Sequence, residues 1–191
     1  MNGILAAGYF LFSLMFSLVT FVLWVRIALR YFRVSSLNPV SQVVYRLTDS
    51  VVLPVAKALR IPNTRQNRYD WPCFIVLVAT EIIKFLLVGW LFFTGIFPWF
   101  LLILYPIADM IVQPLGLLFY AVLIRAIMSW VNPTWRNPFS DLLIVVTEPM
   151  LSIIRRYLPF VAGIDFSPFV LLIVIKVITL FISASMPFHL V

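Results

Sequence analysis

Residues 2–25 read NGILAAGYFLFSLMFSLVTFVLWV and contain no charged side chain. A helix that crosses a bilayer needs roughly 20 apolar residues at a rise of about 1.5 Å each, so this segment is long enough to span one. No basic region precedes it, its apolar run is longer than that of a secretory signal, and no small-residue cleavage site ends it. We therefore expect a first transmembrane helix that is retained.

The rest of the chain has the same apolar character. Hydrophobic residues make up 63% of the 191 positions, mean hydropathy is +1.09, and 11% of residues are charged. This composition lies well outside that of soluble domains and predicts an integral membrane protein. The single cysteine, Cys73, can form no internal disulfide and cannot supply a thiolate metal cluster by itself.

An internal repeat appears when the sequence is shifted by 99 residues. The shift superimposes Arg26 on Arg125, Tyr31 on Trp130, Asn38-Pro39 on Asn137-Pro138, Ser41 on Ser140, Thr48 on Thr147, Asp49 on Glu148, Lys57 on Arg156 and Leu59 on Leu158. Farther along, Asp70 meets Asp165 only after a deletion of three or four residues in the second copy. We interpret residues 1–95 and 96–191 as two copies of one unit.

Each copy reads as an apolar span, a polar connection that contains a short amphipathic helix, and a second apolar span. The predicted fold is an all-α integral membrane protein with four transmembrane helices in two tandem repeats. The spans are expected at about residues 4–31, 72–94, 107–130 and 168–188, and the amphipathic helices at 39–60 and 138–158.

The distribution of positive charge predicts the orientation. Of the 14 basic residues, all but Lys84 and Lys176 lie within residues 26–68 and 125–156. By the positive-inside rule both polar connections face the cytoplasm, so both termini lie outside, and we expect the bacterial inner membrane. Because each copy crosses the membrane twice, the two copies share one orientation and are related by an axis along the membrane normal.

Both connections contain a helix-start signal. In Asn38-Pro39 and Asn137-Pro138, asparagine can accept from the first free backbone N–H groups while proline occupies the first helical position. One face of the first helix is expected to carry Val40, Val43, Val44, Leu47 and Val51, opposite Ser41, Gln42, Arg46 and Asp49. Pro54 and Pro149 are expected to break these helices and restart them as short basic pieces, which end in Lys57 and Arg60 or in Arg155 and Arg156.

Two interpretations of these helices are open. They can lie in the membrane plane and bind the cytoplasmic leaflet, each basic side chain contributing roughly 1 kcal/mol against anionic headgroups. Alternatively, they pack on the spans and only cover the bundle. The net charge of +7 could in principle indicate nucleic acid, but the charges sit beside spans, so anionic lipid is the simpler partner and no nucleic-acid partner is predicted.

Charged residues inside the membrane are candidate functional groups. Glu81 and Lys84 stand three residues apart in the second span and can pair with each other, and Asp109 is expected near the outer end of the third. Lys176, in the fourth span, has no local partner and must bond another helix, reach water or lose its proton. These groups can line a hydrated path of a channel or carrier, or they can be interhelical pins or a socket for a partner's transmembrane carboxylate.

Signals of an enzyme are absent. The sequence contains no zinc-protease, nucleophile-elbow, phosphate-loop or dinucleotide motif. His189, the single histidine, is expected as a solvated residue at the outer interface, and Cys73 as a small apolar filler. We therefore expect no catalytic residue, no metal site and no bound cofactor.

The second copy carries an ordered set of motifs that resembles the signature of YggT family membrane proteins. The set runs from Arg125 to Trp130 and continues through Asn137-Pro138-Phe139-Ser140, Glu148-Pro149, Ile154-Arg155-Arg156, Leu158-Pro159 and Gly163-Ile164-Asp165-Phe166-Ser167-Pro168. The resemblance covers essentially the whole chain and implies a small multi-spanning inner-membrane protein with two copies of the domain.

The first copy departs from this signature, with Asn67-Arg68-Tyr69-Asp70-Trp71-Pro72 in place of the last motif and Ser50 in place of the proline after the acid. Roles tied to the motif are therefore assigned to the second copy first. The motif also has a structural interpretation, because Asp165 and Ser167 can cap the fourth span while Pro168 opens it.

The resemblance implies roles that differ widely: osmotic-stress tolerance, ion uptake, cell division or nucleoid organisation, and, in chloroplast relatives, assembly of a b-type cytochrome. Together they fit a non-enzymatic scaffold or assembly factor that engages lipid and other integral membrane proteins and can form homo-oligomers. The alternative is a small channel or carrier subunit for ions. The candidate contacts with lipid or partners are Arg26, Lys57, Arg60, Glu81, Lys84, Arg125, Asn137, Pro138, Arg155, Arg156, Asp165, Ser167, Pro168 and Lys176.

Overall fold

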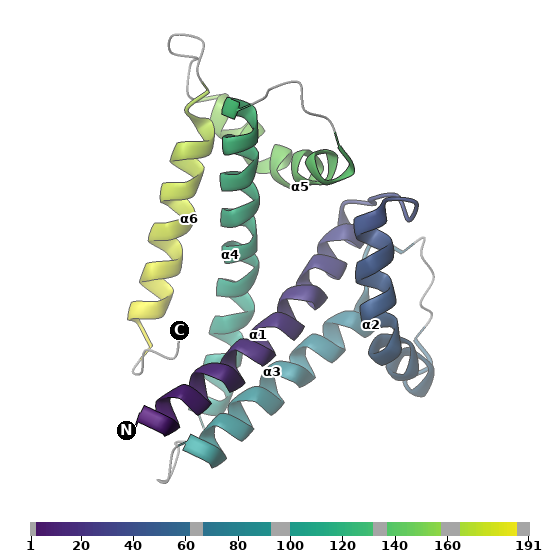
Figure 1. The fold of residues 1–191 in the computed structure, drawn as a ribbon, viewed down its shortest axis with the longest axis vertical. Coiled ribbons are helices and arrows are strands. Elements are labelled where there is room, and N and C mark those ends of the chain that lie inside the picture. The colour runs from purple at the N-terminus through teal and green to yellow at the C-terminus, as the bar shows by residue number, and fades with distance from the viewer. Residues whose placement is uncertain (1–2, 62–66, 93–99, 132–136, 158–164, 187–191) are drawn as a thin grey trace. The chain divides into compact units, whose positions relative to one another are not determined.

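The computed structural model describes residues 3–61, 67–92, 100–131, 137–157 and 165–186 (Figure 1). Within these residues the chain is helical and contains no strand. The helices are α1 (Gly3–Tyr31), α2 (Pro39–Ala58), α3 (Trp71–Phe92), α4 (Leu101–Val131), α5 (Pro138–Arg155) and α6 (Ser167–Ala184). The predicted order of span, short helix and span, repeated once, is confirmed.

Four of these helices are long and apolar enough to cross a membrane, over Ala7–Tyr31, Trp71–Leu91, Ile103–Val131 and Ser167–Ala184. They correspond to the four predicted spans. The largest difference is at α4, which begins six residues before the predicted start at 107 and continues through Pro106 and Pro114. Proline is tolerated inside apolar membrane helices because neighbouring groups satisfy the freed backbone carbonyls.

The two short helices begin at the predicted signals. Asn38 Oδ1 accepts from the N–H of Val40 at 2.9 Å, and Asn137 Oδ1 accepts from the N–H of Ser140 at 2.7 Å. In α5 the Ser140 hydroxyl also bonds the N–H of Asn137 at 2.9 Å, which completes a reciprocal cap. Pro138 stands in the first turn, where its missing N–H removes no helical bond.

The predicted restart after each internal proline is wrong. Both α2 and α5 remain single helices with Pro54 and Pro149 in their interiors. An internal proline removes one backbone hydrogen bond and bends a helix without having to end it, and Figure 1 shows α2 changing direction along its length. The basic residues therefore stand on the last turns of longer helices or just after them.

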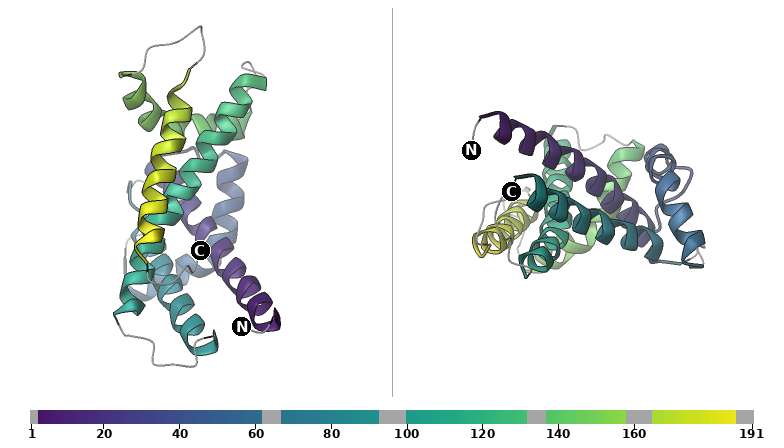
Figure 2. Two further views of the ribbon diagram at one scale, coloured as in Figure 1. Left: turned by 90° about the vertical axis from the view of Figure 1, so that its left-hand side faces the viewer. Right: turned by 90° about the horizontal axis from the view of Figure 1, so that it is seen from below.

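The structure divides into two compact units. Unit 1 comprises residues 1–33 and 41–111, and unit 2 comprises residues 34–40 and 112–191. In unit 1, α1 packs along α3, as the views of Figures 1 and 2 agree. Its core gathers side chains of the first three helices, with Met110 of α4 packed against them: Leu23, Val52, Cys73, Val76 and Leu77. Cys73 is fully buried there, which confirms its prediction as an apolar filler.

Unit 2 has an equivalent core made by α4, α5 and α6. It contains Val122, Leu151, Leu171 and Ile175. Two of these positions match the first core under the 99-residue shift, since Val122 falls on Leu23 and Leu151 falls on Val52. The repeat seen in the sequence is therefore also a repeat of the packing of the short helix on its two long helices.

Candidate membrane-interface site

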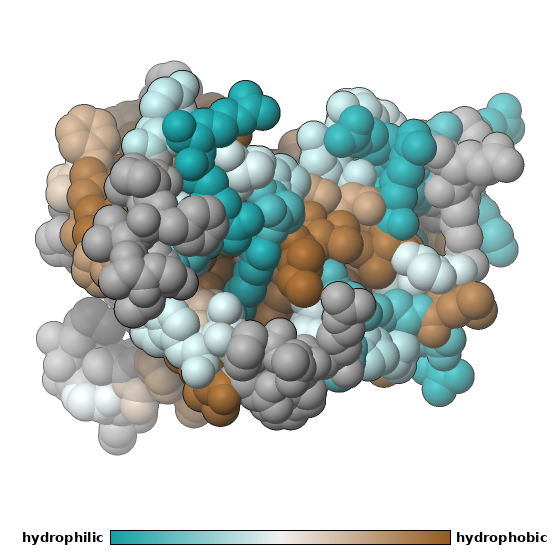
Figure 3. All heavy atoms as spheres, turned by 90° about the horizontal axis from the view of Figure 1, so that it is seen from above, coloured by the Kyte–Doolittle hydropathy of each residue, from teal (hydrophilic) through white to brown (hydrophobic). Residues whose placement is uncertain are grey.

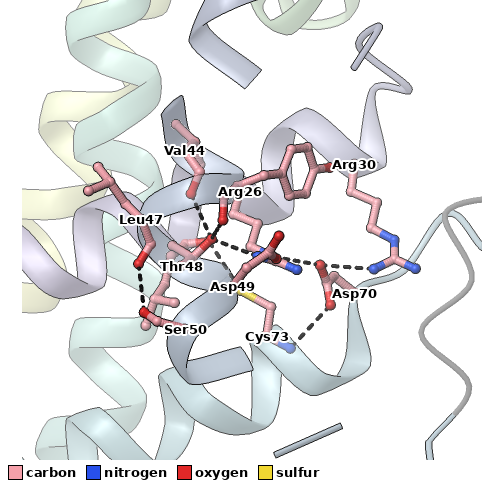
Figure 4. A network of polar contacts seen from close by, with 11 residues as sticks. Arg26, Arg30, Val44, Leu47, Thr48, Asp49, Ser50, Asp70 and Cys73 are labelled. Carbon is pink, nitrogen blue, oxygen red and sulfur yellow. Dashed lines mark hydrogen bonds and ion pairs between the residues drawn. The ribbon is translucent and has the colours of Figure 1, made fainter. Parts of the chain in front are cut away.

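Arg26 joins three helical segments of unit 1 near the polar end of α1. Its Nε donates to Asp70 Oδ2 at 2.9 Å, and its NH1 group donates to Thr48 Oγ1 and to Asp49 Oδ1, both at 2.6 Å (Figure 4). Thr48 and Asp49 belong to α2, whereas Asp70 directly precedes α3. The Arg26 side chain is only 2% exposed, so its charge is balanced inside the protein by Asp49 and Asp70.

Asp70 is the second centre of this network. It accepts from Arg26 and from Arg30 NH1, both at 2.9 Å, and its other oxygen accepts from the N–H of Cys73 at 3.2 Å. The carboxylate is completely buried, but two arginines balance its charge and the third bond caps the start of α3. One carboxylate therefore fixes the end of α1 to the beginning of α3.

The second copy repeats the centre of this arrangement. Arg125 NH1 donates to Thr147 Oγ1 at 2.7 Å, and Arg125 NH2 donates to Glu148 Oε2 at 2.5 Å. These residues match Arg26, Thr48 and Asp49 under the 99-residue shift. The repeat thus preserves a set of contacts in addition to residue types.

The two threonines have the same hydrogen-bond polarity. Thr48 donates its hydroxyl proton to the carbonyl of Val44 at 2.7 Å, and Thr147 donates to that of Leu143 at 2.6 Å. Each hydroxyl oxygen is then left to accept from its arginine. A valine would fill similar space but could not accept this bond.

The networks differ around the acid that precedes each second span. Asp165 accepts from Arg155 Nε at 2.8 Å and from the N–H of Ser167 at 2.9 Å, while Arg155 NH1 donates to Glu148 Oε1 at 2.7 Å. The shift places Arg30 on Ser129, so the second copy lacks that arginine and Arg155 of α5 takes its place. Asp165 therefore supports the start of α6 as predicted, whereas Ser167 is the first helical residue and makes no side-chain cap.

The second network is also more open to solvent. The side chains of Arg125, Arg155 and Glu148 are 18%, 29% and 41% exposed, against 2% for Arg26. Partial burial would raise the pKa of Glu148, but hydrogen bonds and charge from Arg125 and Arg155 outweigh it and lower the pKa below its ordinary value. The pKa of Asp165 is lowered in the same way, against partial burial, by Ser167 and Arg155.

The two short helices α2 and α5 each bury a face that combines small polar and aliphatic residues. In α2 the buried residues are Ser41, Val44, Thr48, Val52 and Ala56, whereas Val43, Leu47 and Val51 are 58%, 60% and 53% exposed. Val44 is therefore separated from its predicted apolar neighbours Val43 and Leu47. It shares the buried face with Ser41 and with Thr48, which accepts a hydrogen bond from Arg26. Much of the apolar surface of α2 is left uncovered by the described residues of unit 1.

The same distribution holds for α5. Its buried residues are Ser140, Leu143, Thr147 and Leu151, and its exposed apolar residues include Phe139, Ile144, Met150 and Ile153. Seen from the end of the molecule at which α5 lies, hydrophilic and hydrophobic side chains are exposed next to each other (Figure 3). A surface of this kind suits the boundary between headgroups and acyl chains.

Several basic residues form no ion pair with the residues that the structure describes. Lys57, Arg60 and Arg156 are exposed at the ends of α2 and α5. Arg33 and Arg60 have φ values of 53° and 51°, in the left-handed region that glycine normally occupies at the end of a helix. Arginine at these two positions is conformationally unfavourable, and nothing in the fold requires its side chain there.

Charges inside the spans form one cluster in unit 1. Lys84 Nζ lies 2.5 Å from Asp109 Oδ2 and 3.6 Å from Glu81 Oε2. The predicted pairing of Glu81 with Lys84 is confirmed, but Asp109 is the nearer partner of Lys84, which helical spacing along α3 does not indicate. Lys176 lies near the middle of α6, is exposed, and forms no ion pair with the described residues.

The remaining residues singled out in the sequence lie either in the first turn of α6 or outside the described residues. Pro168 stands in the first turn of α6, as predicted. His189, Leu158-Pro159 and Gly163-Ile164 lie outside the described residues. Within the described part of the chain, no group of three or more His, Cys, Asp or Glu side chains is arranged to hold a metal ion.

A family model described as CCB3/YggT matches residues 5–91 and again residues 104–186. The chain belongs to the CCB3/YggT family. One match falls in each predicted copy, so the tandem arrangement is confirmed, while the repeat boundary at residue 95 stays a prediction.

Relatives of the chain match it over most of their length. The protein YggT of Escherichia coli strain K12 is 32% identical over 177 residues, which cover 90% of this chain and 86% of that protein. A protein from the proC 3′ region of Vibrio alginolyticus is 32% identical and covers 86% of both chains. A Haemophilus influenzae relative is 33% identical over 81% of this chain and 79% of its own length. No solved structure matches the chain.

Proposed function

We propose that this CCB3/YggT protein is a non-enzymatic scaffold or accessory protein of the bacterial inner membrane. In this proposal α2 and α5 are amphipathic helices that lie on the cytoplasmic leaflet, and the spans engage other membrane proteins. The observation that carries the proposal is the outward apolar surface of α2, with Val43, Leu47 and Val51 exposed while Thr48 bonds the buried Arg26.

The energetics favour a lipid interface for these helices. Removing one exposed aliphatic side chain from water contributes about 1 to 3 kcal/mol, so three on α2 give a substantial driving force. Lys57 and Arg60 follow on the same helix end, and each adds roughly 1 kcal/mol near anionic headgroups. Arg26 and Arg125 hold α2 and α5 against their spans, so little ordering entropy remains to be lost on binding.

Lys176 supports a protein partner within the membrane. A lysine at the centre of a spanning helix costs about 2.5 to 3.5 kcal/mol on insertion scales. Lys176 is exposed on α6, between apolar neighbours such as Ile173 and Val177. A partner helix with an aspartate or glutamate at the same depth would offset this cost, and we propose a partner of that kind.

Site-directed labelling tests the lipid contact. Leu47→Cys and Arg46→Cys would each be labelled with an environment-sensitive fluorophore in the reconstituted full chain, because the native Cys73 is fully buried. We expect the label at position 47 to shift to the blue and to be quenched by spin-labelled lipids, and the label at position 46 to respond much less. Equal quenching at both positions, or none at position 47, would contradict the proposal.

A second candidate function is a small channel or carrier subunit. The charged cluster of Glu81, Lys84 and Asp109 inside the spans is the observation that favours it. The purified protein alone in liposomes would then move ions, and Lys84→Met would change the flux. A scaffold would instead copurify in fixed proportion with a membrane partner and show no flux alone, and Lys176→Leu would abolish that copurification.

A further inference from the structure

An exposed row of aromatic rings lies at the polar end of α1 and α3 in unit 1. The ring of Tyr69 lies 6.2 Å from that of Tyr31 and 6.2 Å from that of Trp71, measured between centroids. Phe74 continues the row at 6.3 Å from Trp71. These four residues, the aromatic row, are 38%, 59%, 57% and 36% exposed in the order Tyr31, Tyr69, Trp71 and Phe74. Neighbouring exposed rings form a contiguous apolar patch, which indicates an interaction surface.

The aromatic row stands where two apolar segments meet their polar connection. Tyr31 is the last residue of the apolar segment Ala7–Tyr31, and Trp71 is the first residue of the apolar segment Trp71–Leu91. Phe74 lies almost one helical turn farther into the second segment. Tyrosine and tryptophan carry a polar group on an apolar ring and prefer the boundary between headgroups and acyl chains, whereas phenylalanine has no such group. The order of the rings therefore matches the change from headgroup to acyl chain at the surface of a leaflet.

Arg68 adds a positive charge to the aromatic row. Its guanidinium carbon lies 4.3 Å from the centroid of the Tyr31 ring, and the residue is exposed. Arg30 Nε donates to the carbonyl oxygen of Asn67 at 3.0 Å, which holds the backbone beside Arg68 against the end of α1. A guanidinium stacked on a ring keeps its N–H edge available for donation. Arg68 is therefore oriented before any ligand binds, which lowers the entropy that binding costs.

The charge of Arg68 is not neutralised by an ion pair within the described residues of unit 1. All acids of unit 1 lie in these described residues, and each forms an ion pair with Arg26, Arg30 or Lys84: Asp49, Asp70, Glu81 and Asp109. None of these ion pairs includes Arg68. The surface therefore offers a cation beside exposed rings, which is complementary to an anionic amphiphile.

The second copy lacks both residues at the centre of this arrangement. Alignment of the acids that precede the two second spans places Gly163 on Arg68 and Ile164 on Tyr69. The first copy therefore departs from the family signature by adding a cation and an aromatic ring. Packing of the helices does not require these two side chains, because Arg68 and Tyr69 are both exposed.

We propose that Arg68 and the aromatic row bind the headgroup of an anionic glycerophospholipid. In the complex the guanidinium edge donates two hydrogen bonds to oxygens of the phosphodiester, and the rings of Tyr69 and Trp71 contact the glycerol backbone and the first acyl carbons. This inference rests on the proposed function in one respect, since it also needs a lipid leaflet at this end of the spans. It uses no residue of α2 or α5, so the two can be tested separately.

Lipid binding to the purified full chain tests the site. The protein in mild detergent would be titrated with phosphatidylglycerol or with phosphatidylcholine, and native mass spectrometry would give the dissociation constant of the first bound lipid. We expect tighter binding of phosphatidylglycerol, because its headgroup carries no cation that would oppose Arg68. Arg68→Gln should weaken the binding of phosphatidylglycerol about fivefold and remove most of the preference over phosphatidylcholine.

Arg33→Gln is the matched control. It removes the same charge from an exposed position two residues beyond Tyr31 and should leave the affinity for phosphatidylglycerol nearly unchanged. The double variant Arg68→Gly, Tyr69→Ile gives the first copy the residues of the second and should weaken binding more than Arg68→Gln does. All these substitutions replace exposed side chains, so Tm and the elution profile should not change.

Three results would overturn the proposal. Equal binding of the two lipids by the wild-type protein would do so without any variant. Equal weakening by Arg68→Gln and Arg33→Gln would show that binding responds to net charge alone. Displacement of the lipid by millimolar inorganic phosphate would show that the site takes the free anion. The label at position 47 reports the α2 contact independently, so its response should persist in Arg68→Gln, and its absence in an otherwise wild-type chain would contradict the proposed function without altering these results.

Discussion

Arg26 on α1 donates to the hydroxyl of Thr48 on α2 at 2.6 Å, and the second copy repeats this bond between the residues 99 positions later. The bond holds Thr48 and Thr147 on the buried faces of α2 and α5, while aliphatic residues such as Val43 and Leu47 stay exposed. The buried arginine fixes the rotation of the helix about its axis.

Removal of Arg26 should lower the stability of the protein more than removal of Arg125. Arg26→Met leaves the fully buried Asp70 with one arginine, and breaking a buried pair costs about 3 to 5 kcal/mol. Arg125→Met affects partly solvated partners and should cost about 1 kcal/mol or less. Thermal unfolding in detergent measures the stability of both variants. Equal losses of stability would show that the burial of the arginine does not decide the cost of removing it.

Repetition of residues predicted part of this network. The 99-residue shift placed the Arg, Thr and acid of one copy on those of the other, and repeated polar residues beside apolar spans indicate contacts that both copies need. The contact between Arg26 and Thr48 could not be deduced from the sequence, because it depends on how α2 is rotated about its axis, and that rotation depends in turn on the hydrogen bond between these two residues. The apolar pattern of α2 alone grouped Val44 with Val43 and Leu47 on one face, whereas the structure buries Val44 and leaves the other two exposed.

Contacts between different helices were harder to predict. Arg155 replaces Arg30 from another position in the repeat, and no alignment of the two copies reveals such an exchange. The pairing of Lys84 with Asp109 depends on the packing of α3 and α4, which helical periodicity does not specify. The sequence does contain one signal for this pairing, since Asp109 is the only acid besides Glu81 within the expected spans.

Acid should weaken the second network. Glu148 and Asp165 have pKa values below their ordinary 4.5 and 3.8, so the folded state binds protons less readily than the unfolded state. Their contribution to stability is fully present above these ordinary values and is lost as the pH falls through the lowered ones. We expect Tm to fall as the pH drops below about 4.5, and to fall less in a Glu148→Gln, Asp165→Asn double variant. An unchanged slope in that variant would contradict this assignment.

The neighbouring residues Arg155 and Arg156 should separate stability from lipid binding. Arg155→Met removes bonds to Glu148 and Asp165 and should lower stability by about 1 kcal/mol. Arg156→Met removes an exposed cation and should leave Tm unchanged. Arg156→Met should also lose the roughly 1 kcal/mol that one basic side chain contributes near anionic headgroups. In a liposome-flotation assay with anionic lipid, we therefore expect the α5 surface of this variant to interact about fivefold more weakly. Opposite results for the two variants would reverse the assigned roles.

Arg60 provides a test of a residue held in an unfavourable conformation. Its φ of 51° suits glycine, so Arg60→Gly should leave stability unchanged or raise it by up to about 1 kcal/mol. Lys57→Gly is the matched control, because it removes a similar charge from inside α2 and should destabilise the helix by about 1 kcal/mol. Both variants should weaken the interaction with anionic lipid. If Arg60→Gly were as destabilising as Lys57→Gly, the left-handed conformation would not be the source of strain.

The two intramembrane lysines should respond in opposite ways to removal of their charge. Lys84→Leu leaves Asp109 and Glu81 buried without their cation and should destabilise unit 1 by about 3 to 5 kcal/mol. Lys176→Leu replaces an exposed charge on an apolar helix and should leave Tm unchanged or raise it, because insertion of α6 becomes easier. If Lys176 binds a partner's carboxylate, the Leu variant stays folded while copurification of that partner is lost. A Lys176→Arg variant should retain the partner because it keeps the charge. A large drop in Tm for Lys176→Leu in the isolated protein would show instead that Lys176 is an internal structural contact.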